Sequence, residues 1–204
     1  MKNNTYGFQS RGIVIKRFFP YKKMIHIFDE EDGVIALHFF DNTLLHRLWP
    51  GMYITYNYSE KGITKYLSSM DILLVPTSSC YQILQQLQRL IKICNYCIQK
   101  NIPNKKHYSL LFVGVHSLMQ NISFFKDIEL WLSALILQDS GHWNKDLYLV
   151  INSFLMKLSM LIDSFIEQEV ELFRKWLTIV NEEHGKSLEV WIEMCLNEQV
   201  YYEE

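Results

Sequence analysis

The sequence has few of the residues that are typical of disulfide-rich, fibrous and disordered proteins. It has only four cysteines, four prolines and eight glycines among 204 residues. So few cysteines exclude a disulfide-rich scaffold, and so little glycine and proline excludes collagen-like and low-complexity chains. Because 49% of the residues are hydrophobic, an intrinsically disordered chain is excluded as well. The sequence predicts a folded protein of one or two domains with a sizeable core.

The motifs of common catalytic sites are also missing. There is no glycine-rich phosphate loop, no His-Glu-x-x-His zinc motif and no Gly-x-Ser-x-Gly nucleophile elbow. The acidic run at 29–32 falls in a predicted turn, which would expose all four carboxylates instead of giving two of them the different environments that acid–base chemistry needs. We expect no catalytic residues and no cofactor, with an unrecognised enzyme as an alternative.

Cysteine spacing gives one pair, Cys94 and Cys97, in a C-x-x-C pattern. Structural zinc needs four ligands, usually from two such pairs, whereas Cys80 and Cys195 are isolated in the sequence. Cys94 also shares a helical apolar face with Leu90. The pattern favours two core thiols and no metal site, with a redox pair or half a metal site as alternatives.

Long hydrophobic runs are absent. Residues 1–8 are polar, and the most apolar stretch, 147–166, contains Asn152, Lys157 and Asp163. A charge at the centre of a bilayer costs about 3 kcal/mol, so this stretch predicts a buried helix and not a membrane span. We expect a cytoplasmic protein with no membrane partner.

Acidic side chains are missing from the middle of the chain. Residues 76–115 hold five basic and no acidic side chains, while residues 116–204 hold six basic and fifteen acidic ones. The net charge of −2 therefore averages a basic front half and an acidic back half, an asymmetry that creates a local field. The basic front half could bind nucleic acid, and the acidic back half could bind a basic protein surface. The alternative is that both halves are solvated surfaces with no partner.

Five short strands are predicted before Pro76, at 11–19, 23–28, 34–40, 52–58 and 65–75. The run from Met52 to Tyr58 alternates with the period of two that is typical of a strand, and the others are rich in β-branched and aromatic residues. So many short strands in so few residues predict a small closed barrel, because closure removes exposed edges.

Helical periodicity replaces the strand pattern after Pro76. Gly141 and Gly185 are predicted helix stops, because glycine readily adopts a positive φ. The predicted helices are 81–99, 106–120, 124–139, 145–166, 167–181 and 187–199, and no breaker near residue 166 excludes one long helix there. The expected fold is α+β, with a barrel domain at 1–76 and an all-α helical domain at 77–204.

Several short motifs accompany these elements. They are RGIVIKR at 11–17, KMIHIF at 23–28, an acidic turn with Gly33, LWPG at 48–51, the helix at 84–93 and DIELWL at 127–132. In this order they resemble the RecO recombination-mediator family, most closely over 8–75 and loosely over 80–140.

The resemblance implies an OB-fold barrel followed by a helical domain, with no catalytic centre. It implies a DNA repair and recombination mediator that binds single- and double-stranded DNA and anneals complementary strands. The implied partners are a RecR-like protein and the C-terminal tail of the single-strand binding protein, for which Arg89 and Lys92 would supply the positive charge. The alternative is a protein-interaction scaffold of the repair complex with little DNA binding of its own.

Two features depart from the family's pattern. The family has a basic stretch after its third strand, where this chain has HFFDN at 38–42, without lysine or arginine. The four-cysteine zinc cluster of many members is also missing.

DNA-binding residues are predicted in two basic clusters, because OB-folds hold single strands with a basic groove and aromatic stacking faces. Tyr21 is the predicted stacking residue, and Lys105 and Lys106 are expected in a mobile loop after Pro103. If the helix at 81–99 packs beside the barrel, the two clusters could line one strip. The first cluster is Arg11, Lys16, Arg17, Lys22 and Lys23, and the second is Arg89, Lys92, Lys100, Lys105 and Lys106.

Overall fold

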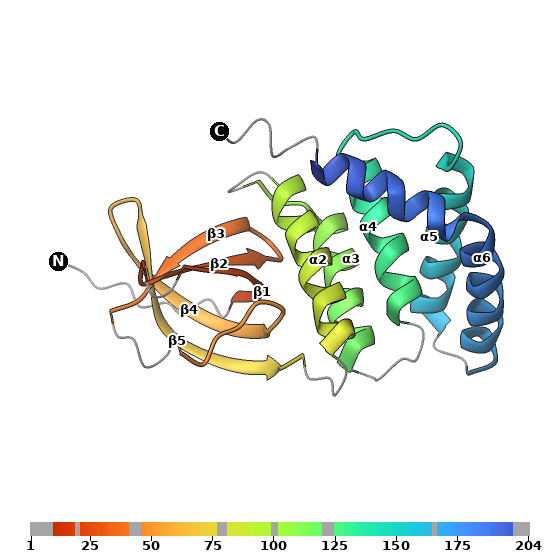
Figure 1. Ribbon diagram of the computed structural model, residues 1–204. Coiled ribbons are helices and arrows are strands. Elements are labelled where there is room, and N and C mark those ends of the chain that lie inside the picture. The colour runs from red at the N-terminus through yellow and green to blue at the C-terminus, as the bar shows by residue number, and fades with distance from the viewer. Residues whose placement is uncertain are drawn as a thin grey trace. The chain divides into compact units, whose positions relative to one another are not determined.

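The computed structural model describes residues 10–18, 21–40, 46–76, 81–98, 102–119, 125–164 and 167–197. The chain divides into two compact units, Met1–Asn121 (unit 1) and Ile122–Glu204 (unit 2). Among the described residues, unit 1 holds the five strands and two helices (Figure 1). The domain limits predicted from the sequence, 1–76 and 77–204, follow the change from strand to helix instead.

The strands of unit 1 close into the predicted five-stranded barrel. They are β1 (Ser10–Arg17), β2 (Met24–Asp29), β3 (Gly33–His38), β4 (Tyr53–Lys61) and β5 (Thr64–Leu74). Their order around the barrel is β1-β2-β3-β5-β4, which is consistent with an OB-fold. Alternate side chains point inward, as period-two strands require, and fill the barrel with Val14, Ile25, Ile27, Ile35, Leu37, Ile54 and Tyr56.

A β-bulge in β1 changes which side chains face outward. The pairing with β2 shifts between Val14 and Lys16, so that Val14 pairs with Ile27 and Lys16 pairs with His26. Ile27 lies in the barrel core, and its neighbour His26 therefore lies on the outer side. The extra residue at the bulge thus turns Lys16 to the outer face of the barrel.

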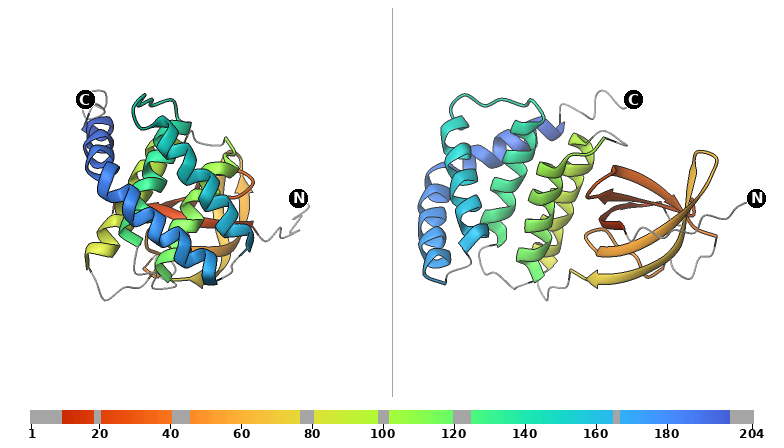
Figure 2. Two further views of the ribbon diagram at one scale, coloured as in Figure 1. Left: turned by 90° about the vertical axis from the view of Figure 1, so that its right-hand side faces the viewer. Right: turned by 180° about the vertical axis from the view of Figure 1, so that it is seen from behind.

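Closure of the barrel depends on a short parallel contact between β3 and β5. Only Leu37 with Lys65 and His38 with Tyr66 are paired there. By contrast, β4 and β5 pair along their length up to Lys61 and Thr64. The tip of this hairpin projects at the end of the barrel away from the helices of unit 1 (Figures 1 and 2).

Two helices, α2 (Tyr81–Cys97) and α3 (Lys105–Met119), pack on the outside of the barrel. The ring of Phe28 meets that of Tyr108 edge to face with centroids 5.5 Å apart. Asn104 caps α3, because its Oδ1 accepts a hydrogen bond from the His107 amide at 3.0 Å. Lys105 and Lys106 therefore belong to the first turn of α3, and their prediction as loop residues is wrong.

Unit 2 contains α4 (Phe125–Asp139), α5 (Tyr148–Ser164) and α6 (Glu167–Asn197). As predicted, Gly141 stops α4, which ends two residues before it; the φ of Gly141 is +95°. The amide of Gly141 donates to the carbonyl of Gln138 and that of His142 to the carbonyl of Leu137, the bond pattern of a Schellman motif.

Gly185 does not end a helix, contrary to the sequence prediction. It lies within α6, which continues through Leu188 to Asn197. A glycine inside a helix costs about 1 kcal/mol. Burial of Leu177 before it and of Leu188 and Ile192 after it offsets that cost, because each buried leucine or isoleucine contributes about 1.5–3 kcal/mol.

No helix in the described parts of the chain is long and apolar enough to cross a bilayer.

Candidate nucleic-acid interface

Five of the predicted binding residues gather where β1 ends and β2 begins. Lys16 and Arg17 close β1, and Tyr21, Lys22 and Lys23 precede β2. The last three are exposed, Tyr21 to 93%. The carbonyl of Lys23 accepts a hydrogen bond from the Phe39 amide at 3.0 Å, which holds this connection beside the end of β3.

Two of these cations lie against aromatic rings. The Nζ of Lys16 is 5.0 Å from the centroid of Phe18. The guanidinium of Arg17 is 4.7 Å from the centroid of Trp49 and donates to the carbonyl oxygen of Leu48 at 3.3 Å. Such contacts hold the charges in place near ring faces.

Beside this connection lies a group of side chains that the sequence analysis missed: His38, Phe40, Lys61 and Tyr66, here called the aromatic platform. Phe40 and Tyr66 stack with ring centroids 4.5 Å apart and planes 12° from parallel. The centroid of His38 is 5.8 Å from that of Tyr66. Lys61 Nζ lies 4.9 Å from the Phe40 centroid and 5.7 Å from the Tyr66 centroid.

The geometry of the platform leaves one ring face open. The two distances from Lys61 differ by far less than the 4.5 Å between the stacked rings. The ammonium group therefore lies beside the stack and not beyond Phe40. Phe40 is 60% exposed, so its outer face can accept a further flat ring, with a positive charge next to it.

The platform and the β1–β2 connection are neighbours. Met24 pairs with His38 across β2 and β3, and His38 pairs with Tyr66 across β3 and β5. In OB-folds, this face and the loops that join β1 to β2 and β4 to β5 bind oligonucleotides. The arrangement offers flat rings for bases and lysines for phosphates.

One signal in the sequence could have pointed to the platform. The segment 38–42 lacks the basic residues of the family's pattern, but it contains Phe40, whose aromatic ring could have indicated a stacking site. Asp41 and Asn42 of that segment lie outside the described residues. The cation of the platform comes from the β4–β5 hairpin instead, through Lys61.

Arg11 and Lys105 lie at the other end of β2, beside the acidic turn. Six residues of β2 span about 17 Å, so these cations are well separated from Lys22 and Lys23. Arg11 lines a pocket of about 540 Å³ with the four acidic residues of the turn, 29–32. Lys105 Nζ is 3.2 Å from Glu31 Oε1.

The remaining predicted residues lie on the two helices of unit 1. Arg89 is half-buried and Lys92 exposed on α2, and Lys106 is exposed on α3. Lys100 of the second cluster lies outside the described residues. The structure thus brings Lys16, Arg17, Tyr21, Lys22 and Lys23 together, but does not bring Arg11 or Lys105 to them.

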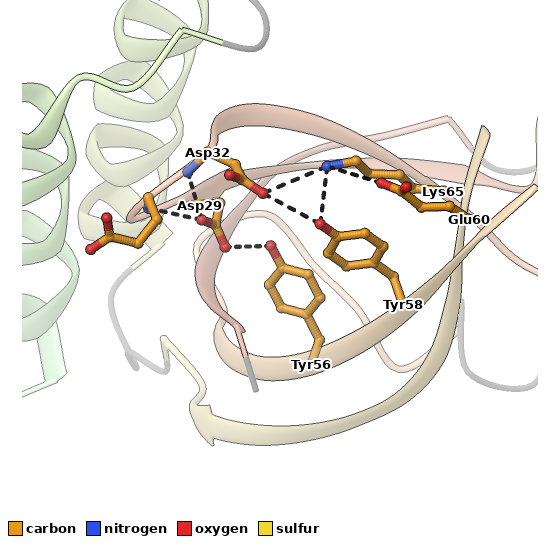
Figure 3. Close-up of polar contacts among 7 residues, drawn as sticks. Asp29, Asp32, Tyr56, Tyr58, Glu60 and Lys65 are labelled. Carbon is orange, nitrogen blue, oxygen red and sulfur yellow. Dashed lines mark hydrogen bonds and ion pairs between the residues drawn. The ribbon is translucent and has the colours of Figure 1, made fainter. Parts of the chain in front are cut away.

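The acidic turn is not wholly solvated, which corrects the sequence prediction. Asp29 is only 2% exposed. One oxygen of its carboxylate accepts hydrogen bonds from the amides of Glu31 and Asp32 at 2.8 and 2.9 Å, and the other accepts one from the hydroxyl of Tyr56 (Figure 3). A carboxylate with three donors can be buried, so Asp29 ties the turn to β4.

Lys65 is engaged in the barrel rather than available to a ligand. Its Nζ lies 3.5 Å from Asp32 Oδ2 and 3.9 Å from a carboxylate oxygen of Glu60, and donates to Tyr58 Oη at 3.1 Å (Figure 3). Partial burial acts to lower the pKa of Lys65, but the hydrogen bond to Tyr58 and the nearby acids raise it overall.

Tyr56 makes the barrel sensitive to alkaline pH. Burial, and then the charge and hydrogen bond of Asp29, raise its pKa well above the usual value. The phenol of the unfolded chain releases its proton near pH 10, whereas the folded one keeps it. The stabilisation that comes from this raised pKa is therefore complete below pH 10 and is lost progressively above it.

We expect the free energy of unfolding, measured in urea, to fall from pH 9 to 11, and less steeply in Tyr56→Phe. An equal slope in the variant would contradict this. Burial also raises the pKa of Tyr108, so part of the slope should persist.

On α2, Cys94 is buried, as the sequence predicts for a core thiol, whereas Cys97 is only half-buried, and neither forms a disulfide. Burial raises the pKa of Cys94, which disfavours the reactive thiolate. Among the residues whose placement is described, no cluster of three or more His, Cys, Asp or Glu could hold a metal ion; Cys80 lies outside them.

The chain matches no family model and no curated protein. The expected resemblance to the RecO family therefore rests on the sequence motifs alone, and the candidate interface rests on the geometry of the barrel.

Proposed function

We propose that this protein is a RecO-like mediator of DNA repair and recombination. It binds DNA without sequence specificity, anneals complementary strands and helps to load recombinase together with a RecR-like protein and the single-strand binding protein. The observation that carries the proposal is the aromatic platform beside Lys22 and Lys23, on a barrel consistent with an OB-fold.

The chemistry of the platform suits any base. Every nucleobase has a flat face that can stack on Phe40, and lysines contact the phosphates that all sequences share. A strand held through its backbone and one stacked base keeps the pairing edges of its other bases exposed. Such a strand can meet its complement, which is the requirement for annealing.

Removing the stacking ring or the loop charges is expected to weaken binding in different ways. Phe40→Ala should weaken binding of a fluorescent single-stranded oligonucleotide about 5- to 140-fold, because a stacked base contributes about 1–3 kcal/mol.

The double variant Lys22→Ala/Lys23→Ala should reduce the slope of log affinity against log salt by about 1.4, since each lost phosphate contact removes about 0.7. Fluorescence anisotropy from 50 to 300 mM salt measures both.

Lys186→Ala is the matched control, because Lys186 is an exposed lysine of α6 in the acidic unit 2. It should leave the affinity and the salt slope unchanged. Undetectable binding of the wild-type protein at low salt would contradict the proposal. The scaffold alternative would then stand, favoured by the acids that face Arg11 and Lys105, and a RecR-like protein should still bind.

A further inference from the structure

The tip of the β4–β5 hairpin carries an apolar side chain where turns are usually polar. Gly62 and Ile63 form the two-residue turn between the paired residues Lys61 and Thr64. Turns favour Gly, Asn, Asp, Ser and Pro, each for its backbone conformation or its hydrogen bonds. Here Gly62 supplies the positive φ of +64°, and Ile63 is fully exposed to solvent. The fold of the hairpin therefore gives no reason for an isoleucine at this position.

The residues near Ile63 in the hairpin indicate which ligand its side chain would contact. Two residues before it, Lys61 lies beside the Phe40–Tyr66 stack, and three residues after it Tyr66 forms part of that stack. The hairpin tip projects from the barrel on the side away from α2 and α3 (Figures 1 and 2). A strand that stacks one base on Phe40 and places a phosphate at Lys61 reaches the hairpin tip, since Lys61 lies two residues from Ile63.

We propose that Ile63 is a wedge that inserts between neighbouring bases of single-stranded DNA held on the aromatic platform. The inference rests on the proposed function and names the way in which that site holds its ligand. Isoleucine is among the apolar residues that proteins insert between base steps, where they unstack the bases. In a single strand only one stacking contact is lost, and Phe40 offers a new stacking face to one of the two separated bases. The bound strand is therefore held with its bases apart, ready to pair.

Fluorescence of 2-aminopurine tests the wedge, because stacking between adenines quenches this base and unstacking restores its emission. The probes are eight-nucleotide oligoadenylates with one 2-aminopurine at each internal position in turn. Saturating wild-type protein should raise the emission at least threefold for one or more of these probes. Ile63→Ser should reduce the rise to less than one fifth of the wild-type value, while the dissociation constant from anisotropy changes less than threefold. Ile63→Leu should keep the rise, because it keeps an apolar wedge.

Val190→Ser is the matched control, since Val190 is an exposed β-branched residue on α6 of unit 2. It should keep the full rise. If the wild-type protein binds the probes but Ile63→Ser gives the same rise in 2-aminopurine emission, the proposal that Ile63 inserts between bases is wrong and the proposed function stands. If the wild-type protein does not bind the probes at low salt, the proposed function itself fails, and the wedge with it. Far-UV circular dichroism of each variant shows that the fold is kept.

Discussion

Asp29→Ala is expected to lower the free energy of unfolding of unit 1 by about 3–5 kcal/mol. The carboxylate is buried and accepts hydrogen bonds from the hydroxyl of Tyr56 and from the amides of Glu31 and Asp32. Its removal leaves the buried hydroxyl of Tyr56 and the part-buried amides of Glu31 and Asp32 without their acceptor, and a hydrogen bond to a charged group contributes about 1.5–3 kcal/mol, less where water can replace it. Urea unfolding followed by circular dichroism measures the change.

The neighbouring Asp32 provides the control, because its carboxylate is 47% exposed and its two side-chain contacts are long, 3.5 Å to Lys65 Nζ and 3.4 Å to the hydroxyl of Tyr58. An exposed ion pair contributes about 0–1 kcal/mol, so Asp32→Ala should be mild. If Asp29→Ala were as mild as Asp32→Ala, Asp29 would not be the residue that ties the turn to β4.

Phe154→Ala is expected to destabilise unit 2 by about 3–5 kcal/mol, the usual cost of truncating a buried aromatic ring. Phe154 on α5 is fully buried. Its ring lies 5.5 Å from that of Trp131 on α4 and 5.9 and 6.4 Å from those of Phe173 and Trp176 on α6. One ring thus joins the three helices. Tryptophan fluorescence during urea unfolding follows the loss, since two of the partners are tryptophans.

Leu149→Ala is the control on the same helix, because Leu149 is 74% exposed. A surface substitution of this kind changes the free energy of unfolding by less than about 0.5 kcal/mol. A similar loss in both variants would show that the aromatic cluster does not hold unit 2 together.

The fold could be predicted from the sequence because most of its signals are local. All five strands and the stop at Gly141 follow from alternation, turn residues and the freedom of glycine. Gly185 shows the limit of local signals. Whether a glycine ends a helix depends on what packs beside it, and the burial of Leu188 and Ile192 is not written in the residues next to it.

The candidate interface could be predicted from the sequence only in part. The lysines of the β1–β2 connection follow from residue type and position. The platform does not, because Phe40, Lys61 and Tyr66 are brought together by the pairing of β3 with β5. Tertiary contacts also decide which cations face acids, and Lys105 is turned toward Glu31 by its place at the start of α3.

The short contact between β3 and β5 has a consequence for how a ligand acts on the barrel. His38 and Tyr66 form one of its two pairs and also belong to the platform. A ladder this short is where local opening of the barrel costs the least. Under the proposed function, a strand stacked on the platform would bind only the closed form, so mass action would favour closure. We therefore expect hydrogen exchange in the unliganded barrel to be fastest at this seam. Under the proposed function, nucleic acid would slow exchange there and would itself help to keep the barrel closed.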